Sequence, residues 1–553
     1  NGDHTVDVQL NGLVVGTIHS VFQDVATVRL TLPPGALLPR DNSVVLTGRT
    51  SDEIAVELSQ RLTYPRHYSL SAALRFTAPG GTDLVLSGAD SSTRVLDITN
   101  VLQPAAVSGS ATGEGLRVTA SGTGSRILYA YRDQDVLAPS VVANVPSSWH
   151  SAQGADLVII VPRSLQPSLQ PLVAQRVREG LQVAVVDIED VYDEFSAGEK
   201  DAMAIRAFLS NARSWSNPPS FVLLAGRATY DPRGWLGQPE LDQVPTALIQ
   251  TRYLETGSDD VLVTFDGATA PGLAVGRLPF SSVEDMDAAV AKILGRRLAS
   301  PTQSLLLVHD RDGNISFSAA SAEVASAFSG WKTQDFARGA DDGATHTDLV
   351  AALRAGPIAV DFQGHGAEDL WAGRILSAAD TDALSGAGTT SLFVAATCLN
   401  AYYLDIGRES LGGALLRTPN GGAWGVWASS AMTLPTEHAL LSKTLLSGAL
   451  QEGLTLGEAT LKAKLAVTDP EVRSSFQLLG DPSARAVATQ RAALTSTGAP
   501  KAGALGCSTS GAPLAFLAPL VLALLMLAAR GRAASVRPIR DSLGCRAPRV
   551  EPT

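Results

Sequence analysis

The stretches PIAVDFQGHG (357–366) and TSLFVAATC (390–398) decide the fold of this chain. Each starts as a continuous apolar run, which is typical of a strand buried on both faces of a parallel sheet. Further runs of this kind are DLVIIVP (156–162), LQVAVVDI (181–188), SFVLLAG (220–226), GLAVGRL (272–278), SLLLVHD (304–310) and GAWGVWASS (422–430). Because amphipathic helical patterns lie between most of them, we predict an α/β domain over residues 155–486, with a mainly parallel sheet and helices on both faces.

In a sheet of this kind, functional side chains collect just beyond the carboxyl ends of the strands. His365 follows the first stretch and Cys398 ends the second. The segment 367–389 is long enough for a helical crossover, so the two strands can be parallel neighbours about 5 Å apart. An imidazole beside a thiol generates a thiolate nucleophile and then serves as the general acid. We therefore predict a catalytic pair of His365 and Cys398, with the backbone N–H groups of Gly366 and Cys398 directed at a developing oxyanion.

Each of these two residues also has an ordinary explanation. A cysteine after an apolar run is commonly a core residue, and a histidine between two glycines is commonly a turn residue. The chain has only three cysteines and eight histidines, so their coincidence at adjacent strand ends favours the catalytic interpretation. The spacing alone leaves both interpretations open.

A set of ordered motifs surrounds this pair. They are GHGAEDLW (364–371), AATCLNAYY (395–403), ESLGGALLR (409–417), GGAWGVWASS (421–430) and LLGDPSAR (478–485). In this order they resemble the catalytic core of the gingipain-type cysteine peptidases, which are relatives of the caspase-like fold. The resemblance extends over about residues 155–486. It implies a cysteine endopeptidase that works through a thioester acyl-enzyme, with His365 as acid or base and Cys398 as nucleophile.

The family places an acidic residue after the strand that corresponds to SLLLVHD, and this chain offers Asp310 and Asp312 there. A third group usually orients the imidazole of a nucleophile–histidine pair. We take Asp310 as this group because it is nearest to the strand end. Asp312 and Glu368 are alternatives, and a solvated turn explains both aspartates equally well.

Two features depart from the family pattern. Arg227 stands where many relatives have an aspartate. The stretch AMTLPTEH (431–438) lacks the aromatic residue that closes the specificity pocket of relatives specific for basic residues. Specificity for Arg or Lys is therefore not predicted for this chain.

The sequence predicts no metal or other cofactor, because it has no CxxC pair, no HExxH motif and no cluster of Cys and His. Since gingipain relatives can bind calcium, a calcium site at Asp259, Asp260 and Asp266 is a weaker alternative, although this loop lacks the spaced ligands of a known calcium loop. The net charge of −11 argues against nucleic acid as a partner of the general surface.

Residues 1–150 predict an all-β, sandwich-like accessory region, because short stretches alternate apolar with polar residues between turn signals. These stretches are VDVQLNGLVVG (6–16), VATVRLTLP (25–33), NSVVLTGRT (42–50), IAVELSQRLTY (54–64) and LRVTASG (116–122). Nothing in this region indicates a chemistry of its own.

The segment APLAFLAPLVLALLMLAA (512–529) carries no charged residue and is followed by an arginine-rich tail at 530–553. Its length is at the lower end of what spans a bilayer, and a basic flank stays in the cytoplasm. After a linker at 487–511, we therefore predict one transmembrane helix that holds the catalytic domain of an exported protein outside the membrane. A buried core helix is the alternative.

Gly506 and Cys507 precede this segment. With the apolar run and the arginine cluster they resemble the C-terminal sorting segment of myxobacterial surface proteins, in which the Gly-Cys pair is processed and modified after export. The resemblance implies processing or lipidation at Cys507. The residues beyond the first arginine pair, including Cys545, depart from that pattern.

Together these observations predict a surface-anchored cysteine endopeptidase that acts on proteins or peptides. One alternative is a non-catalytic surface module that uses the peptidase fold for binding or adhesion. The other is a processing enzyme for surface proteins, which has the same chemistry and a different partner.

Overall fold

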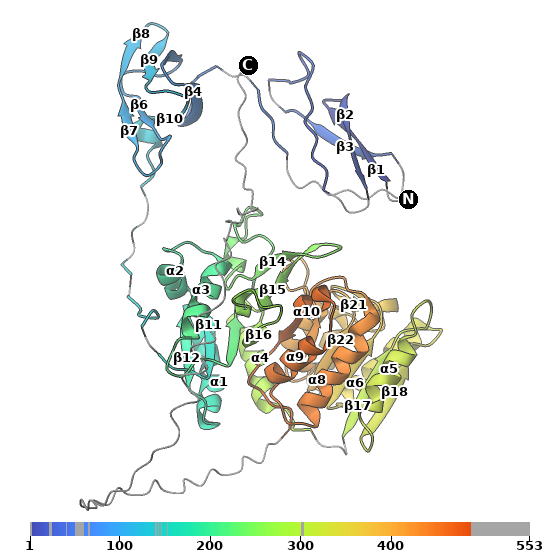
Figure 1. Ribbon diagram of the computed structural model, residues 1–553. Coiled ribbons are helices and arrows are strands. Elements are labelled where there is room, and N and C mark those ends of the chain that lie inside the picture. The colour runs from blue at the N-terminus through green and yellow to red at the C-terminus, as the bar shows by residue number, and fades with distance from the viewer. Residues whose placement is uncertain are drawn as a thin grey trace, which may run out of the picture. The chain divides into compact units, whose positions relative to one another are not determined.

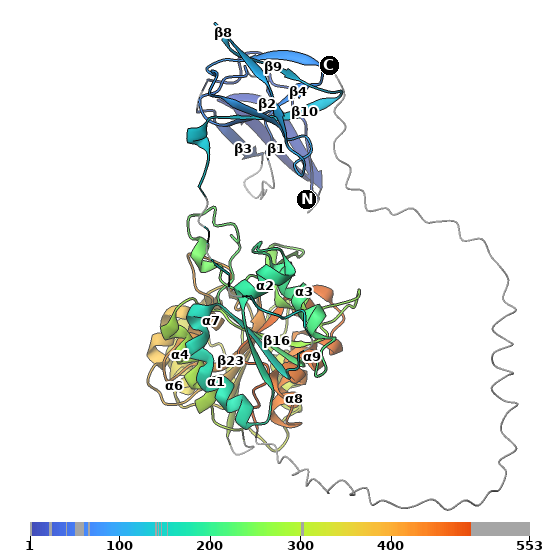
Figure 2. The ribbon, with the colours of Figure 1, turned by 90° about the vertical axis from the view of Figure 1, so that its left-hand side faces the viewer.

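The computed structural model describes residues 3–21, 25–39, 41–49, 60–64, 67–138, 141, 143–144, 146–151, 153–299 and 303–487. Figures 1 and 2 show their helices and strands from two directions. Residues 153–487 form an α/β part, and the strands that precede it form small antiparallel sheets.

A ten-stranded sheet with the order β12-β11-β13-β16-β24-β23-β22-β19-β17-β18 forms the centre of the α/β part (Figure 1). Its strands are β11 (Leu157–Val161), β12 (Val183–Asp187), β13 (Phe221–Ala225), β16 (Ala274–Leu278), β17 (Ser304–His309), β18 (Lys332–Ala337), β19 (Ala359–Gln363), β22 (Ser391–Ala396), β23 (Ala423–Ser429) and β24 (Phe476–Leu479). The pairs within β12-β11-β13-β16 and within β23-β22-β19-β17-β18 are all parallel. Between these groups, β24 is antiparallel to β23 and joins β16 through the single residue pair Arg277 and Leu479.

Helices cover both faces of the sheet, as the apolar runs predict. They are α1 (Gln166–Arg178), α2 (Ile188–Phe195), α3 (Ala202–Ala212), α4 (Val283–Gly295), α5 (Phe317–Ser326), α6 (Asp342–Arg354), α7 (Leu411–Arg417), α8 (His438–Leu450), α9 (Leu456–Ala466) and α10 (Pro470–Ser475). Figure 2 shows α1, α4, α6 and α7 on one side of β16 and β23, and α8 and α9 on the other. Leu157, Ile159 and Val161 of β11 pack with α1 and α4, whereas Val158 and Ile160 pack with α2 and α3. Both faces of the strand are therefore buried, which explains its continuous apolar sequence.

The connection between β19 and β22 differs from the predicted helical crossover. Residues 367–389 hold the end of a short hairpin, β20 (Gly366–Ala367) with β21 (Leu370–Trp371), and two 3-10 helices at Ala372–Arg374 and Ala378–Leu384. The two strands are nevertheless parallel neighbours, as predicted. The segment is therefore long enough for a crossover but holds no α-helix. Its first part turns back onto β19, where the Trp371 ring stacks on Phe362 with 4.0 Å between the centroids.

The N-terminal region contains antiparallel strands in three small sheets with the orders β2-β1-β3, β4-β10-β6-β7 and β5-β9-β8. The strands are β1 (Asp3–Leu10), β2 (Leu13–Val21), β3 (Val44–Gly48), β4 (Leu74–Pro79), β5 (Thr82–Leu86), β6 (Arg94–Asp97), β7 (Ala105–Val107), β8 (Gly109–Thr112), β9 (Gly115–Ala120) and β10 (Ser125–Tyr131). The second and third sheets share one apolar core, which includes Phe76, Leu86, Val118 and Leu128, and this is a sandwich-like arrangement.

One predicted strand of this region is absent. Residues 25–33, VATVRLTLP, have no strand in the structure. Val25 and Val28 are exposed, and although Leu30 lies against Gly16 of β2, the stretch joins no sheet among the described residues.

The predicted C-terminal elements lie outside the described residues, except for residue 487 of the linker. They include the apolar segment 512–529, the basic tail 530–553 and Cys507. Within the part of the chain that the structure describes, no helix is long and apolar enough to cross a membrane.

Candidate active site

The two strands that carry the predicted catalytic pair end side by side. Gln363 of β19 lies opposite Ala396 of β22 in the parallel register, so His365 and Cys398 each follow the last paired residue at the same distance along the chain. The Gly364 N–H donates to the Ala396 carbonyl at 3.5 Å. The sheet therefore brings His365 and Cys398 to one edge.

The Cys398 thiol is half-buried and turned toward the loop that follows β23. Its Sγ lies 3.8 Å from the carbonyl oxygen of Thr433, to which it donates a hydrogen bond. Burial raises the pKa of the thiol above its usual value, so the resting group is a protonated thiol. The next residue, Leu399, has a left-handed backbone with a φ of 62°, and its N–H donates to the Ala431 carbonyl at 3.1 Å. This turn directs the chain sharply away from the strand.

The His365 side chain is exposed, and its ring lies edge-on to Phe317, with 5.0 Å between the centroids. Neither ring nitrogen has a hydrogen-bond partner among the described residues, and no hydrogen bond joins the imidazole to Cys398. The two residues follow the ends of neighbouring strands, but no hydrogen bond joins their side chains. Any proton transfer between the two side chains would require the thiol to leave the Thr433 carbonyl and turn toward His365.

Asp310 is buried at the end of β17 and contacts the backbone of His365. Its Oδ2 accepts from the His365 N–H at 3.3 Å, and its Oδ1 accepts from Arg338 Nη1 at 2.9 Å and from the Arg311 N–H at 2.7 Å. Arg338 also binds Asp342. The carboxylate predicted to orient the imidazole therefore fixes the main chain that carries it.

The two alternatives to Asp310 have other partners. Asp312 accepts from the Ser318 N–H at 2.9 Å, in the first turn of α5. Glu368 pairs with Arg408 at 3.3 Å. Neither carboxylate contacts the His365 ring.

The backbone donors predicted for the oxyanion are available. Among the described residues, the Cys398 N–H has no acceptor. Ala372 N–H donates to the His365 carbonyl at 2.8 Å, and Trp371 N–H donates to Leu376 at 2.8 Å. Because bonded and non-bonded positions alternate along an antiparallel pair, Gly366, which lies opposite Trp371, directs its N–H away from β21.

A polar contact next to the thiol was not predicted from the sequence. Thr433 Oγ1 lies 2.9 Å from Nε2 of His438, the first residue of α8. His438 is only 3% exposed, and burial lowers the pKa of its imidazole to about 4, so it is neutral. The sequence signal was present, because both residues belong to the stretch AMTLPTEH, but that stretch was interpreted only for its missing aromatic residue.

A second buried group lies within β19. Gln363 Nε2 donates to Asp361 Oδ2 at 2.9 Å and to Ser442 Oγ of α8 at 3.0 Å. Asp361 is completely buried, and the loss of hydration raises the pKa of its carboxyl to about 6. An acidic residue within an apolar run gave no indication in the sequence of which helix it would face.

Asn400 was also missed, although it lies within the motif AATCLNAYY. Its Oδ1 accepts from Trp371 Nε1 at 2.7 Å, and its Nδ2 donates to the Ala367 carbonyl at 2.6 Å. It therefore joins the turn after Cys398 to the hairpin after His365.

The carboxylates considered for calcium are each paired with a basic side chain. Asp259 binds Arg277, Asp260 binds Lys464 and Asp266 binds Arg213. A cation at this loop would have to displace these partners. Among the described residues, no group of three or more His, Cys, Asp or Glu side chains is arranged to hold a metal ion.

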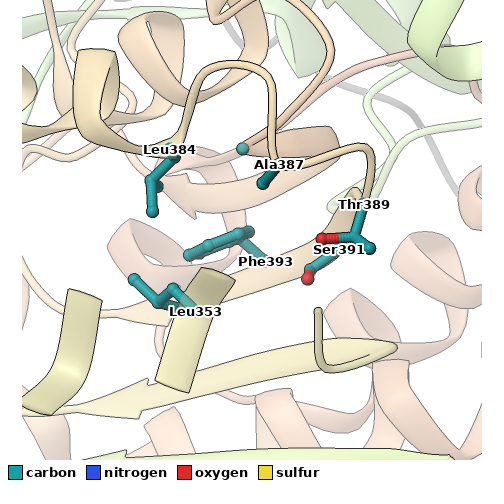
Figure 3. Close-up of a pocket in the computed structure, with 7 residues that line it drawn as sticks. Leu353, Leu384, Ala387, Thr389, Ser391 and Phe393 are labelled. Carbon is teal, nitrogen blue, oxygen red and sulfur yellow. The ribbon is translucent and has the colours of Figure 1, made fainter. Parts of the chain in front are cut away.

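A small cavity lies at the opposite edge of the sheet, near the start of β22. It has a volume of about 10 Å³ and is lined by Leu353, Leu384, Ala387, Thr389, Ser391, Phe393 and Gly422. Figure 3 shows Leu353 and Leu384 on either side of the Phe393 ring, with Thr389 and Ser391 at one end. This volume suits a single water molecule rather than a substrate, so the cavity does not compete with the strand-end site.

Comparisons with known proteins agree with this architecture. A family model described as peptidase family C25 matches residues 150–487. The crystal structure of the Arg-specific cysteine proteinase gingipain R superposes with a TM-score of 0.51 at 17% identity, covering 62% of this chain and 80% of that chain. The complex of the Porphyromonas gingivalis RgpB pro- and mature domains gives a TM-score of 0.51 at 17% identity, covering 60% and 79%. These structures show the shared fold. No curated protein matches the sequence.

Proposed function

Because the chain belongs to peptidase family C25 and is a cysteine peptidase, we propose that it is an endopeptidase in which Cys398 is the nucleophile and His365 transfers the proton. The observation that supports this proposal is the parallel register of β19 and β22, which brings His365 and Cys398 to the same edge of the sheet. The substrates are proteins or peptides, as expected for a peptidase family.

The reaction that this geometry supports begins with transfer of the Cys398 proton to His365. The thiolate attacks the peptide carbonyl carbon, and the oxyanion accepts hydrogen bonds from the N–H groups of Gly366 and Cys398. The tetrahedral intermediate collapses as the C–N bond breaks, and His365 gives its proton to the leaving amine. Water, deprotonated by His365, then hydrolyses the thioester, which releases the carboxyl product and restores the thiol.

In this proposal Asp310 acts on His365 through the main chain. Its charge is balanced by Arg338 at 2.9 Å, and its contact with the His365 N–H holds the base at the strand edge. The role predicted from the sequence, which was to orient the imidazole, is thus performed indirectly.

Arg specificity belongs to gingipain R by its description, and we do not extend it to this chain. Arg227, which replaces an aspartate found in many relatives, donates to the Asp405 carbonyl and is part of the loop packing. The stretch 431–438 has no aromatic residue. Substrate preference is therefore proposed to differ from that of relatives specific for basic residues.

We also propose that the enzyme is exported and anchored at the cell surface through 512–529, with processing at Cys507. The apolar segment and its basic flank support this topology. If the Gly506-Cys507 pair is processed, the membrane-bound protein lacks residues 530–553, and Cys507→Ala releases it into the medium. Intact-mass analysis of the membrane fraction tests this, because an unmodified Cys507 followed by an intact tail contradicts processing.

A cleavage profile on a peptide library tests the catalytic proposal. We expect internal peptide bonds to be cut by the wild-type protein and not by Cys398→Ala, with His365→Ala reduced at least about a thousandfold. Equal cleavage by wild type and Cys398→Ala would refute the assignment of the nucleophile. No cleavage by either protein, after any activation step, would favour the binding module.

A further inference from the structure

The Asn400 side chain joins the two loops of the predicted catalytic pair. It is 1% exposed and follows shortly after Cys398, whereas its two partners, Ala367 and Trp371, lie in the hairpin that follows His365. Its Oδ1 accepts from Trp371 Nε1 at 2.7 Å, and its Nδ2 donates to the Ala367 carbonyl at 2.6 Å. One side chain thus contacts both strands of the hairpin.

Both ends of this connection are fixed. The Trp371 ring is fully buried and stacks on Phe362 of β19, with 4.0 Å between the centroids and 9° between the planes. On the other side, the Asn400 carbonyl accepts from the Gly412 N–H at 2.9 Å in the first turn of α7. The Asn400 side chain therefore bridges two anchored segments.

Sheet pairing does not by itself set the distance between the two reacting groups. The ladder between β19 and β22 ends at Gln363 and Ala396, and His365 and Cys398 lie beyond it without a hydrogen bond between them. Their separation depends on the loops. A displacement of about 1 Å at a catalytic group can cost roughly a hundredfold in rate, so a rigid connection at this point has a direct effect on the chemistry.

We propose that Asn400 is a positioning residue that sets the approach of His365 to Cys398. The inference rests on the proposed cysteine peptidase function. Asn400 touches neither the substrate nor the reacting atoms, and it acts through the hairpin of Trp371 and Ala367. Without it, the hairpin and the thiol loop lose their direct side-chain connection, and the thiol is no longer held at the right distance from the imidazole that accepts its proton.

Three variants separate this role from ordinary stability. Asn400→Asp keeps the acceptor for Trp371 and places a second acceptor against the Ala367 carbonyl. Asn400→Leu has a similar size and no polar group. Trp371→Phe retains an aromatic ring for stacking on Phe362 and removes the donor, together with part of the ring volume. Asn211→Leu is the matched control, because Asn211 Nδ2 donates to the Trp149 carbonyl at 3.0 Å in a part of the fold remote from β19 and β22.

The decisive measurement is the pH profile of Cys398 alkylation by iodoacetamide, followed on the Cys398 peptide by mass spectrometry in the full-length protein. Iodoacetamide reacts with the thiolate, so an imidazole partner gives reactivity below pH 7 that an isolated thiol lacks. We expect Asn400→Asp and Asn400→Leu to lower the rate of Cys398 alkylation below pH 7 by at least about tenfold, so that both resemble His365→Ala. Trp371→Phe should be intermediate. Adding His365→Ala to Asn400→Asp should cause little further loss.

Peptide hydrolysis provides a second readout. We expect kcat to fall at least about tenfold in Asn400→Asp, with KM changed less than about threefold, while Asn211→Leu lowers only the free energy of unfolding. A wild-type pH profile and kcat in Asn400→Asp would overturn the proposal, whatever the stability of the variant. If the Asn400 variants do not fold, Trp371→Phe provides the test. A wild-type pH profile of Cys398 alkylation in Trp371→Phe would overturn the positioning role of Asn400. If wild type cleaves no peptide but its alkylation depends on His365 and Asn400, the positioning role stands and the peptidase proposal fails.

Discussion

Asp310 accepts a hydrogen bond from the backbone N–H of His365, with 3.3 Å between Oδ2 and the nitrogen. The same carboxylate is paired through Oδ1 with Arg338 at 2.9 Å. A group that holds the main chain of a general base controls where the base sits, whereas a group bonded to the ring would also control its protonation. Asp310 could orient His365 through its backbone or through its ring, and the sequence alone does not distinguish these two roles. The structure shows the backbone contact.

Replacing Asp310 by asparagine removes the charge that faces Arg338 and weakens the hold on the His365 backbone. We expect kcat to fall about tenfold to a hundredfold, because the base is displaced, while the acidic limb of the pH–rate profile keeps its midpoint. Asp312→Asn should retain activity within about twofold, since Asp312 contacts only the first turn of α5. A shift of the acidic midpoint by more than about one unit in Asp310→Asn would indicate a direct contact with the imidazole instead.

Gly366 has no room for a side chain. A Cβ there would lie 2.6 Å from Thr397 Oγ1 and 3.0 Å from the Leu370 carbonyl, so Gly366→Ala should shift the N–H that is proposed to bind the oxyanion. We expect kcat to fall at least about a hundredfold, with alkylation of Cys398 within about threefold of wild type. Gly313→Ala is the control, because its Cβ would meet no atom within 4 Å. Unchanged kcat in Gly366→Ala would remove Gly366 from the oxyanion site.

Thr433 links the thiol to a buried neutral histidine. Thr433→Val removes the contact of Oγ1 with His438 Nε2, which holds the Thr433 carbonyl near the Cys398 Sγ. With this carbonyl less firmly held, we expect Cys398 alkylation at pH 7 to accelerate about threefold, whereas Thr433→Ser should behave like wild type. Slower alkylation in Thr433→Val would mean that the loop activates the thiol rather than holding its protonated form.

Asp361 makes stability depend on pH. Its carboxyl pKa is raised from 3.8 to about 6 by complete burial, so the folded state binds one more proton than the unfolded state between these values. Stability is therefore highest below about pH 4 with respect to this group, falls as the pH rises to about 6, and is lower by about 3 kcal/mol above it. Asp361→Asn should remove this dependence.

Urea unfolding at pH 4.5 and pH 8 measures the effect. Relative to wild type, Asp361→Asn should be more stable at pH 8 than at pH 4.5 by up to about 2 kcal/mol, because part of the effect is already present at pH 4.5. The exposed Asp348 on α6 supplies the control, since Asp348→Asn should change the difference by less than about 0.5 kcal/mol. An equal effect of both substitutions would show that Asp361 is hydrated in the folded protein.

Most of the sheet and the location of the site could be predicted from the sequence, because continuous apolar runs mark strands buried on both faces. This is why β19 and β22 and the placement of His365 and Cys398 beyond their ends were expected. The edge strand β18, KTQDFA, lacked that signal because most of its side chains are exposed. Residues 25–33 alternate as a strand would but join no sheet among the described residues.

The fine structure of the site was less predictable because it depends on contacts across loops. Asp310 contacts the backbone of His365 and not its ring. The turn after β17 sets this geometry, and hydrophobic periodicity in the sequence does not predict the shape of a turn. His438 reaches Thr433 because α8 starts just after that loop, and Asn400 reaches Trp371 because the chain forms a short hairpin of β20 and β21 directly after His365. These side-chain partners depend on tertiary structure, which local sequence patterns do not encode.

Trapping of an acyl-enzyme tests the central claim most directly. A peptide ester is mixed with the full-length enzyme, the reaction is quenched in acid within milliseconds, and the adduct is located by mass spectrometry. We predict a thioester on Cys398 in wild type, at least about a hundredfold less in His365→Ala, and none in Cys398→Ala. Hydrolysis of the ester at the wild-type rate by Cys398→Ala, or turnover without any adduct on Cys398, would contradict the account.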